Sequence, residues 1–399
     1  MRSPLSGFRI LDLTNVLSGP FCCHQLAHMG AEVIKVEIPG SGDLARQLGA
    51  DPTLNEKNMG ISFLAQNPGK KSITVNLKTP EGKDILRKLV KTSEVLVENF
   101  RPGVMDRLGV GFEELKQENP KLIYCAISGF GQDGSMKELP AYDQIIQGMS
   151  GVMSITGSSD TAPYRVGYPL CDTIGGMTAA FAIAAALADR NREDARFIDV
   201  SMLEATMATM GWVVSNHLIG GIDPKPLGND NFTSSPSGTF KTADKAINIA
   251  ANKQEHFESI CQIIGQDNLI ADPLFSIRQS RLENREALTG ILESAFQNWT
   301  ADDLLATFKK TGVPAGPVNS IPDILADPQI RDRGMIATYE DVKDVPVPVK
   351  VLRPGFKVNG QAPSVEMPPP VLGEHTEDLL KELGFESDQI DDLHARGVI

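Results

Sequence analysis

Cysteine is scarce in this sequence, and the five cysteines follow no regular spacing. Their number is odd and Cys22 and Cys23 are adjacent, which does not fit a disulfide framework. The cysteines and the six histidines also show no metal-ligand spacing, since neither Cys-x-x-Cys nor His-Glu-x-x-His occurs. We therefore expect free thiols, a reducing cytoplasmic location and no bound metal.

A basic surface and a secretion signal are missing as well. The formal net charge is −13, which argues against nucleic acid or an anionic membrane as a partner. Asp12 interrupts the first apolar run, and no basic segment precedes it, so no signal peptide is expected. Residues 1–120 carry 15 Lys and Arg against 14 Asp and Glu, whereas residues 121–399 carry 23 against 37. The N-terminal part is therefore the better place for an anionic ligand.

Strand and helix patterns alternate through the first 200 residues. This alternation predicts an α/β fold with a doubly wound parallel sheet, whose ligands bind at the carboxyl ends of the strands. Buried strands are expected at 8–14, 31–37, 71–78, 94–98, 122–128 and 196–200, with helices at 18–29 and 80–90 between them.

A second, smaller domain is predicted farther along the chain, because 399 residues exceed the usual size of a single core. An apolar helix at 202–218 leads into an irregular stretch at 220–238 that contains three prolines. A hairpin near 243–245 and helices near 255–264, 285–297 and 301–310 follow. We expect a large domain at 1–220, a small α+β domain at 221–330, and a return linker with the rest of the large domain at 331–399.

Asp172 precedes the most apolar stretch of the chain, Thr173–Ala188, which contains no charge. Its alanines, with Gly175 and Gly176 for close packing, predict a helix that is apolar and buried on every side. Sixteen residues at about 1.5 Å each are too short for a membrane span. Asp172 is then either the N-cap of this helix or a nucleophile that the helix N-terminus keeps ionised.

Other motifs fall at predicted strand ends. A literal G-x-G-x-x-G spans Gly129–Gly134, but a proline soon stops the segment that follows, which favours a loop over a dinucleotide site. Arg46, in a glycine-containing turn, is a candidate phosphate ligand. Phe100 could stack on a base while Arg101 or Arg107 pairs with phosphate, and a capped loop is the alternative. Tyr142 is either a hydrogen-bonding group of a site or a packed loop tyrosine.

Several of these segments, taken in order, resemble the class III (CaiB/BaiF) CoA-transferases. The segments that carry the resemblance are PLSG at 4–7, LDLT at 11–14, SGP at 18–20, GAEVIKVE at 30–37, GSGD at 40–43, VENFRPG at 97–103, SGFG at 128–131 and LGEHT at 372–376. They extend over nearly the whole chain.

The resemblance implies a Rossmann-like large domain joined by linkers to a smaller domain, in an interlocked homodimer. It implies a catalytic role for Asp172. CoA contacts would come from Lys78, Asn99, Phe100, Arg107 and Leu108. It also implies a mobile glycine loop at Ser235–Gly238, here with the single Gly238. This chain has Ile38 where some relatives have arginine.

The activity that the resemblance implies is transfer of CoA from an acyl-CoA thioester to a carboxylic acid, with no permanently bound cofactor. Asp172 would attack the thioester, pass through an anhydride and an aspartyl-CoA thioester, and be helped by N–H groups at its helix start and near Gly238. Tyr142 would orient the acyl group. Arg165 is a candidate for binding a second carboxylate on the acceptor, or else a surface arginine.

Two other functions remain open at this stage. An acyl-CoA racemase of the same fold is one, but this chain has neither the histidine nor the glutamate of those enzymes at Tyr142 and near Asn252–Lys253. A non-catalytic nucleotide-binding protein is the other.

Overall fold

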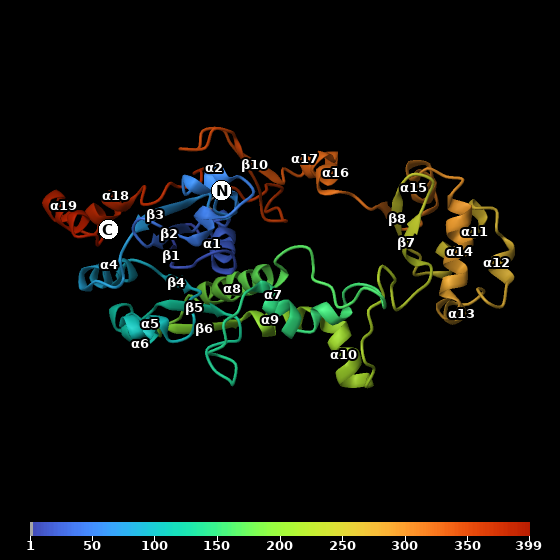
Figure 1. The fold of residues 1–399 in the computed structure, drawn as a ribbon, viewed down its shortest axis with the longest axis horizontal. Coiled ribbons are helices and arrows are strands. Elements are labelled where there is room, and N and C mark those ends of the chain that lie inside the picture. Colours follow the sequence, from blue (N-terminus) through green and yellow to red (C-terminus); the bar gives the residue numbers. More distant parts are fainter. Residues whose placement is uncertain (1–2) are drawn as a thin grey trace. The chain divides into compact units, whose positions relative to one another are not determined.

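The computed structural model describes residues 3–399, which divide into two compact units (Figure 1). Unit 1 extends to residue 152 and adds residues 165–220 and 328–399. Unit 2 consists of residues 153–164 and 221–327. The segment 153–164 therefore groups with unit 2, although its neighbours on both sides in the sequence belong to unit 1.

A six-stranded parallel sheet forms the centre of unit 1, which confirms the predicted α/β fold. Its strand order is β3-β2-β1-β4-β5-β6. This order reverses between β1 and β4, the point where doubly wound sheets bind ligands. The strands are β1 (Arg9–Asp12), β2 (Glu32–Glu37), β3 (Lys70–Thr74), β4 (Val95–Glu98), β5 (Ile123–Ser128) and β6 (Arg196–Ser201).

Helices cover both faces of this sheet. One face carries α1 (Ser18–His28) and α8 (Leu170–Ala188), and the other carries α4 (Pro80–Lys91) and α6 (Phe112–Glu118). The sequence explains α4 well, because Pro80 occupies its first position and Thr79 accepts the N–H of Gly82. Its apolar residues recur at helical spacing and all enter the core.

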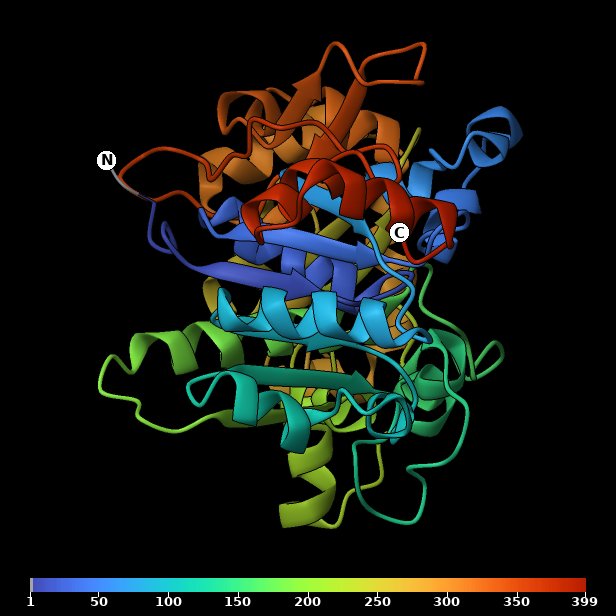
Figure 2. The same cartoon turned by 90° about the vertical axis from the view of Figure 1, so that its left-hand side faces the viewer.

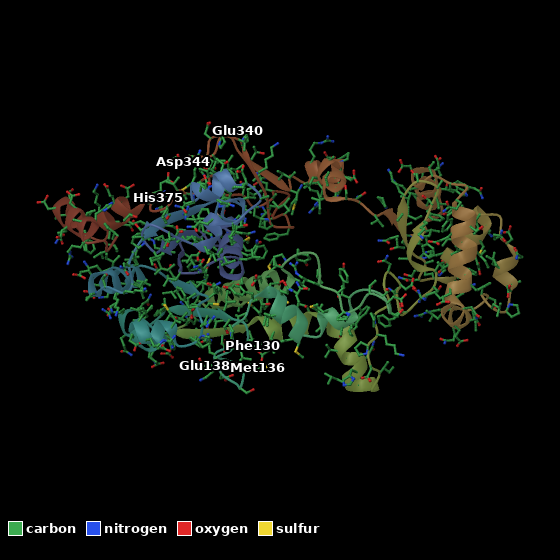
Figure 3. The ribbon with its side chains drawn as sticks, viewed as in Figure 1. Phe130, Met136, Glu138, Glu340, Asp344 and His375 are labelled. Atoms are coloured by element: carbon green, nitrogen blue, oxygen red, sulfur yellow. The ribbon has the colours of Figure 1, made fainter. Side chains whose placement is uncertain are left out.

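The C-terminal segment closes the sheet at β3. Thr376 Oγ1 accepts the N–H of Thr74 at 3.1 Å, and the carbonyl of Val398 accepts the N–H of Asn76 at 2.7 Å. The backbone N–H of His375, a residue labelled in Figure 3, donates to the backbone carbonyl of Ser72. Figure 2 shows α18 (Thr376–Glu382) and α19 (Ser387–Ala395) beside the N-terminal strands. The last residues of the chain thus complete a sheet that the first residues begin.

Helix α8 differs from its prediction in length and in burial. It begins at Leu170 rather than Thr173, and only one face is buried, which includes Gly176, Ala179 and Ile183. Phe181 on the opposite face is 75% exposed. The prediction of burial on every side is therefore wrong for the single chain, because no other described element packs on the Phe181 face.

The length argument against a membrane span also fails. Nineteen residues make α8 long and apolar enough to cross a membrane by length and composition, a test that a core helix passes as well. The packing of α8 against α1, β5 and β6 is what marks it as a core helix here.

Unit 2 has its own small sheet and core. Strands β7 (Ser237–Lys241), β8 (Ala246–Ala250) and β9 (Ala315–Pro317) are antiparallel, and β7 and β8 form the predicted hairpin. Helices α11 (Gln254–Ile263), α14 (Arg285–Phe296) and α15 (Ala301–Thr311) match the predicted ones. The core contains five phenylalanines, Phe240, Phe257, Phe275, Phe296 and Phe308.

The predicted helix at 202–218 is divided in two. Helix α9 (Met202–Thr209) has Met210 as its C-cap, and α10 (Gly211–Gly220) begins at Gly211, which has a φ of +22°. The remaining elements are η1 (Leu44–Gln47), α2 (Pro52–Glu56), α3 (Ile61–Leu64), α5 (Val104–Leu108), α7 (Asp143–Met149), η2 (Val152–Ile155), α12 (Asn268–Ala271), α13 (Arg278–Glu283), α16 (Ile321–Ala326), α17 (Pro328–Asp332), β10 (Ile336–Tyr339) and β11 (Val349–Leu352).

Candidate active site

Asp172 lies in the first turn of α8, inside the helix rather than before it. Pro169 is the N-cap residue and makes no side-chain capping bond. The interpretation of Asp172 as the N-cap is therefore wrong, because the helix begins two residues earlier. Among residues 3–399, no side chain or backbone group forms a hydrogen bond with the Asp172 carboxylate. The carboxylate is thus not committed to holding the helix.

Asp143 caps α8 from another helix. Its Oδ1 accepts the N–H of Cys171 at 2.7 Å and that of Asp172 at 3.3 Å, and its Oδ2 accepts Gln147 Nε2 at 2.7 Å. Asp143 and Gln147 are both buried, one turn apart on α7, and Gln147 also binds the backbone at Val166. The sequence reasoning missed Asp143, and only its spacing of four residues from Gln147 could have suggested it.

The pKa of Asp172 is raised to about 7, first by burial and second by the negative charge of Asp143. The sequence predicted that the helix N-terminus keeps this carboxylate ionised, whereas burial and Asp143 leave it only about half ionised near neutral pH. Because the N–H groups of Cys171 and Asp172 donate to the Asp143 carboxylate, a second negative charge lies close to Asp172. Asp172 can take up and release a proton in the physiological range.

The activity should rise with pH through the Asp172 pKa if this carboxylate reacts in its charged form. With a pKa of about 7, the ionised fraction falls about tenfold from pH 8 to pH 6, and kcat/KM should follow. Asp143→Asn removes the neighbouring charge and should move the midpoint to lower pH. A profile of kcat/KM against pH for both proteins measures this, and an unchanged midpoint in the variant would contradict it.

A cavity of about 240 Å³ contains Asp172 at the carboxyl ends of three strands. The loop after β1 contributes Asn15, Val16, Leu17 and Ser18, the loop after β4 contributes Asn99 and Arg101, and the end of β5 contributes Ile127, Ser128 and Gly129. Leu44, Ala141, Tyr142 and Met202 complete the lining. The cavity holds one carboxylate and one cationic side chain, Arg101.

The start of α1 lies against the helix of Asp172. Gly176, one turn after Asp172, packs so closely that an added Cβ would lie 2.3 Å from the carbonyl oxygen of Ser18. Leu17, the N-cap of α1, makes no side-chain capping bond. Within the described part of the chain, the N–H groups of Leu17, Ser18 and Gly19 have no acceptor. Unlike the N–H groups of α8 that were expected to bind an oxyanion, these donors are free.

A second cavity of about 370 Å³ lies at the ends of β1, β2 and β3. Three of the five predicted CoA contacts line it, namely Lys78, Phe100 and Leu108. Ile38, the position where some relatives have arginine, also lines it and is 47% exposed. Asn15 lines both this cavity and the cavity of Asp172. The two cavities are therefore neighbours along the edge of the sheet.

The other two predicted CoA contacts lie elsewhere. Asn99 lines the cavity of Asp172, and its amide is hydrogen-bonded to the backbone of Asn15. Arg107 lines a third cavity of about 530 Å³ together with Glu98, whose pKa burial raises to about 8. Arg107 thus does not share a cavity with Phe100, because α5 contributes Val104 and Leu108 to the second cavity and Met105, Asp106 and Arg107 to the third.

Arg46 is not the phosphate ligand that its motif suggested. Its guanidinium is fully buried, makes two hydrogen bonds to Glu37 at 2.7 and 2.8 Å, and stacks over Phe63. A glycine-rich turn with arginine was interpreted as a ligand site, but the charge of Arg46 is neutralised inside the protein. This ion pair fixes the turn after β2 instead.

The remaining predicted residues have different surroundings. Tyr142 lines the cavity of Asp172 and is 69% exposed. Arg165 is exposed and is not among the residues that line this cavity. Gly238 was predicted in a loop but lies in β7, opposite Ile249, because the hairpin pairing extends to Ser237. Residues 129–134 form turns with no helix, and Figure 3 shows the loop that carries Phe130, Met136 and Glu138.

Known proteins of similar sequence and structure match this chain over nearly its whole length. The family model described as "CoA-transferase family III" matches residues 5–376. The chain is 38% identical to succinyl-CoA:glutarate CoA-transferase of Mus musculus, over 99% of this chain and 90% of that protein. It is 39% identical to acetyl-CoA:oxalate CoA-transferase of Acetobacter aceti, over 88% and 90%. A crystal structure of a CAIB/BAIF family protein from Brucella suis is 34% identical, with a TM-score of 0.84 over 96% of this chain and 100% of that chain.

Proposed function

Because the chain belongs to CoA-transferase family III, we propose that it moves CoA between carboxylic acids through covalent intermediates on Asp172. The single observation that supports this role is the position of Asp172. Its half-buried carboxylate has no hydrogen-bond partner in residues 3–399 and lines a cavity at the switch point of the sheet. A free carboxylate in such a place is suited to nucleophilic attack.

The first half of the reaction removes CoA from the donor. An oxygen of ionised Asp172 attacks the thioester carbonyl, the carbon–sulfur bond breaks, and CoA leaves as a thiolate. A mixed anhydride of Asp172 and the acyl group remains. The thiolate then attacks the aspartyl carbonyl of this anhydride, which releases the donor acid as a carboxylate and leaves an aspartyl-CoA thioester. No net proton is consumed in these steps.

The second half repeats these steps in reverse with the acceptor. The acceptor carboxylate attacks the aspartyl-CoA thioester, and CoA thiolate leaves again. The thiolate attacks the acceptor carbonyl of the new anhydride, which gives the product thioester and restores the Asp172 carboxylate. Each tetrahedral step places negative charge on a carbonyl oxygen, and the free N–H groups of Leu17 and Ser18, which line the cavity, are suitable donors for it.

The neighbouring cavities suggest where CoA binds. Phe100, Val104 and Leu108 give the second cavity an apolar side for the nucleoside, and Lys78 supplies a positive charge for phosphate. Pantetheine would then pass Asn15, which lines both cavities, to bring the sulfur to Asp172. Residues 1–120 carry almost no net charge in a protein that is acidic overall, which also supports CoA binding in this part of the chain.

Small dicarboxylates are the acceptors that we propose. The similar proteins named above transfer CoA to glutarate and oxalate. A cavity of about 240 Å³ suits an acid of this size, and Arg101 supplies a cation for the second carboxylate. Arg165, the residue suggested by the sequence, does not line this cavity.

Trapping of the intermediate tests the proposed function. The protein is incubated with a panel of acyl-CoA donors, then with hydroxylamine, which converts an anhydride or thioester of Asp172 to a hydroxamate. We expect mass spectrometry to locate the hydroxamate on the peptide that contains Asp172, and dicarboxylates to accept CoA better than monocarboxylates. Deuterium exchange at the substrate α-carbon without an acceptor would instead indicate a racemase, and the absence of any adduct a binding protein.

A homodimer is also proposed, since the single chain leaves large apolar side chains uncovered. No residue of α10 is buried, and Trp212 and Leu218 are 75% and 76% exposed. We expect twice the chain mass of 43.1 kDa in light scattering after gel filtration. The double change Trp212→Asp and Leu218→Asp should shift the protein to monomer, whereas Trp212→Phe should not. A monomeric wild-type protein at micromolar concentration would contradict the proposal.

A cytoplasmic location, without nucleic acid or membrane as partner, completes the proposal. All five cysteines are free and buried in the structure, which suits a reducing compartment. The net charge of −13 opposes binding to polyanions.

A further inference from the structure

The loop that joins β1 to α1, residues Asn15–Leu17, has an unusual backbone. Val16 has a φ of +67°, in the left-handed region that β-branched residues rarely adopt. The other non-glycine residues with positive φ in residues 3–399 are Asn58, Asp344 and Asn359, types that tolerate this region better. This conformation is strained for a valine, so the surrounding structure must impose it.

Asn99 holds the loop from the side of β4. Its Oδ1 accepts the N–H of Asn15 at 2.8 Å, and its Nδ2 donates to the carbonyl of Asn15 at 2.8 Å and to Ser18 Oγ at 3.3 Å. Both polar groups of the Asn15 backbone are thus bound by one side chain. Asn99 was predicted to contact CoA, but its amide is already occupied by these bonds.

Asp43 holds the same loop from the side of β2. Its Oδ1 accepts the N–H of Val16 at 2.9 Å, and its Oδ2 pairs with Lys35 Nζ at 2.8 Å. Lys35 also donates to the carbonyl of Thr14 at 2.9 Å. The side chains of Asp43 and Lys35 are fully buried, so the position of the Asp43 carboxylate is fixed within the protein.

The loop leads directly to the free donors of α1 and to the cavity of Asp172. Val16, Leu17 and Ser18 line that cavity together with Asp172. Helix α8 meets this end of α1 at the contact of Gly176 with Ser18. A change in the Val16 backbone would therefore rotate the N–H groups that follow it relative to Asp172.

We propose that Asn99 and Asp43 are positioning residues for the CoA-transfer reaction. They hold Val16 in its left-handed conformation and thereby fix the N–H groups of Leu17 and Ser18 beside the reacting carbonyl. This inference rests on the proposed role of Asp172 as the nucleophile. It assigns Asn99 to the geometry of the reaction, and not to the binding of CoA.

A comparison of Asn99→Ala in two backgrounds tests the inference, because glycine adopts positive φ without strain. In the wild-type background we expect Asn99→Ala to lower kcat about 10- to 100-fold, as loss of oxyanion donors does, with the Kd for CoA changed less than about twofold. In the Val16→Gly background the loop needs no such restraint. There the same substitution should lower kcat at most about threefold relative to Val16→Gly alone.

Other outcomes separate the two proposals. An equal loss in both backgrounds, or a loss confined to CoA affinity, would overturn the positioning role while a hydroxamate on Asp172 still supported the nucleophile. If the wild-type protein formed no hydroxamate, the proposed function itself would fail. Should Asn99→Ala not fold, Asn99→Asp keeps the acceptor for the N–H of Asn15 and replaces the donor with a charged oxygen that faces the Asn15 carbonyl. We expect kcat to fall in this variant as well, and no drop would contradict the inference.

Discussion

Asp172→Asn should reduce CoA transfer by at least about 1,000-fold while CoA still binds, because asparagine has nearly the same shape but cannot attack a thioester. The Asp172 side chain forms no hydrogen bond within residues 3–399, so the substitution breaks none. Turnover measured with an acyl-CoA donor and a dicarboxylate acceptor, and the Kd for CoA from calorimetry, give the two quantities. Near-normal turnover would refute the nucleophilic role.

The stability of the same variant provides its control. The folded-state pKa of Asp172 is about 7, above its ordinary value of 3.8, because burial and Asp143 disfavour the charged form. The charge therefore does not destabilise the fold below about pH 4, and destabilises it fully above about pH 7. Asp172→Asn should raise Tm relative to wild type at pH 8 and have little effect at pH 4. Equal changes in Tm at both values would show that the pKa of Asp172 is not raised.

Gly176→Ala should damage both stability and catalysis. The new Cβ would lie 2.3 Å from the carbonyl oxygen of Ser18 and 3.3 Å from the nitrogen of Cys22, and backbone atoms cannot move aside as side chains do. Helices α1 and α8 must then separate, at a loss of about 1–3 kcal/mol in the free energy of unfolding. The separation also moves Asp172 away from the start of α1, so kcat should fall about 10- to 100-fold. Chemical denaturation and steady-state kinetics measure the two effects.

Gly290→Ala is the matched control for this change. Gly290 lies inside α14 in unit 2, and an added Cβ there meets no atom within 4 Å. Alanine favours the helix more than glycine does, so this variant should be as stable as wild type or up to about 1 kcal/mol more stable. Gly176→Ala with wild-type stability and kcat would show that the contact between α1 and α8 does not set the position of Asp172.

The sequence predicted the parallel sheet well because its strands are short, apolar runs bounded by turn residues. The predicted strands at 31–37 and 122–128 match β2 and β5 within one residue, and the predicted helix at 80–90 matches α4. The residue types within and next to each of these elements are enough to define its bounds. The helix at 202–218 was predicted without its break because nothing but Gly211 marks the end of α9.

The active site was less predictable, because it depends on contacts between distant segments. Asp143 lies 29 residues from Asp172 in the sequence, and its hydrogen bonds to the start of α8 leave no periodic pattern. Burial sets the pKa of Asp172, and the sequence suggested the opposite shift from the helix terminus alone. Arg46 was misassigned for the same reason, since its partner Glu37 could equally have been a surface residue.

The hydrogen bonds between the C-terminal segment and β3 also affect how the protein folds during synthesis. The backbone of β3 and of Asn76 is bonded to residues 375, 376 and 398, so this edge of the sheet stays open until those residues have left the ribosome. Residues 221–327 have a core of their own and can fold earlier. The newly made chain therefore exposes an unpaired strand until residues 375–398 are available, and a truncation that removes them would leave that edge open to aggregation.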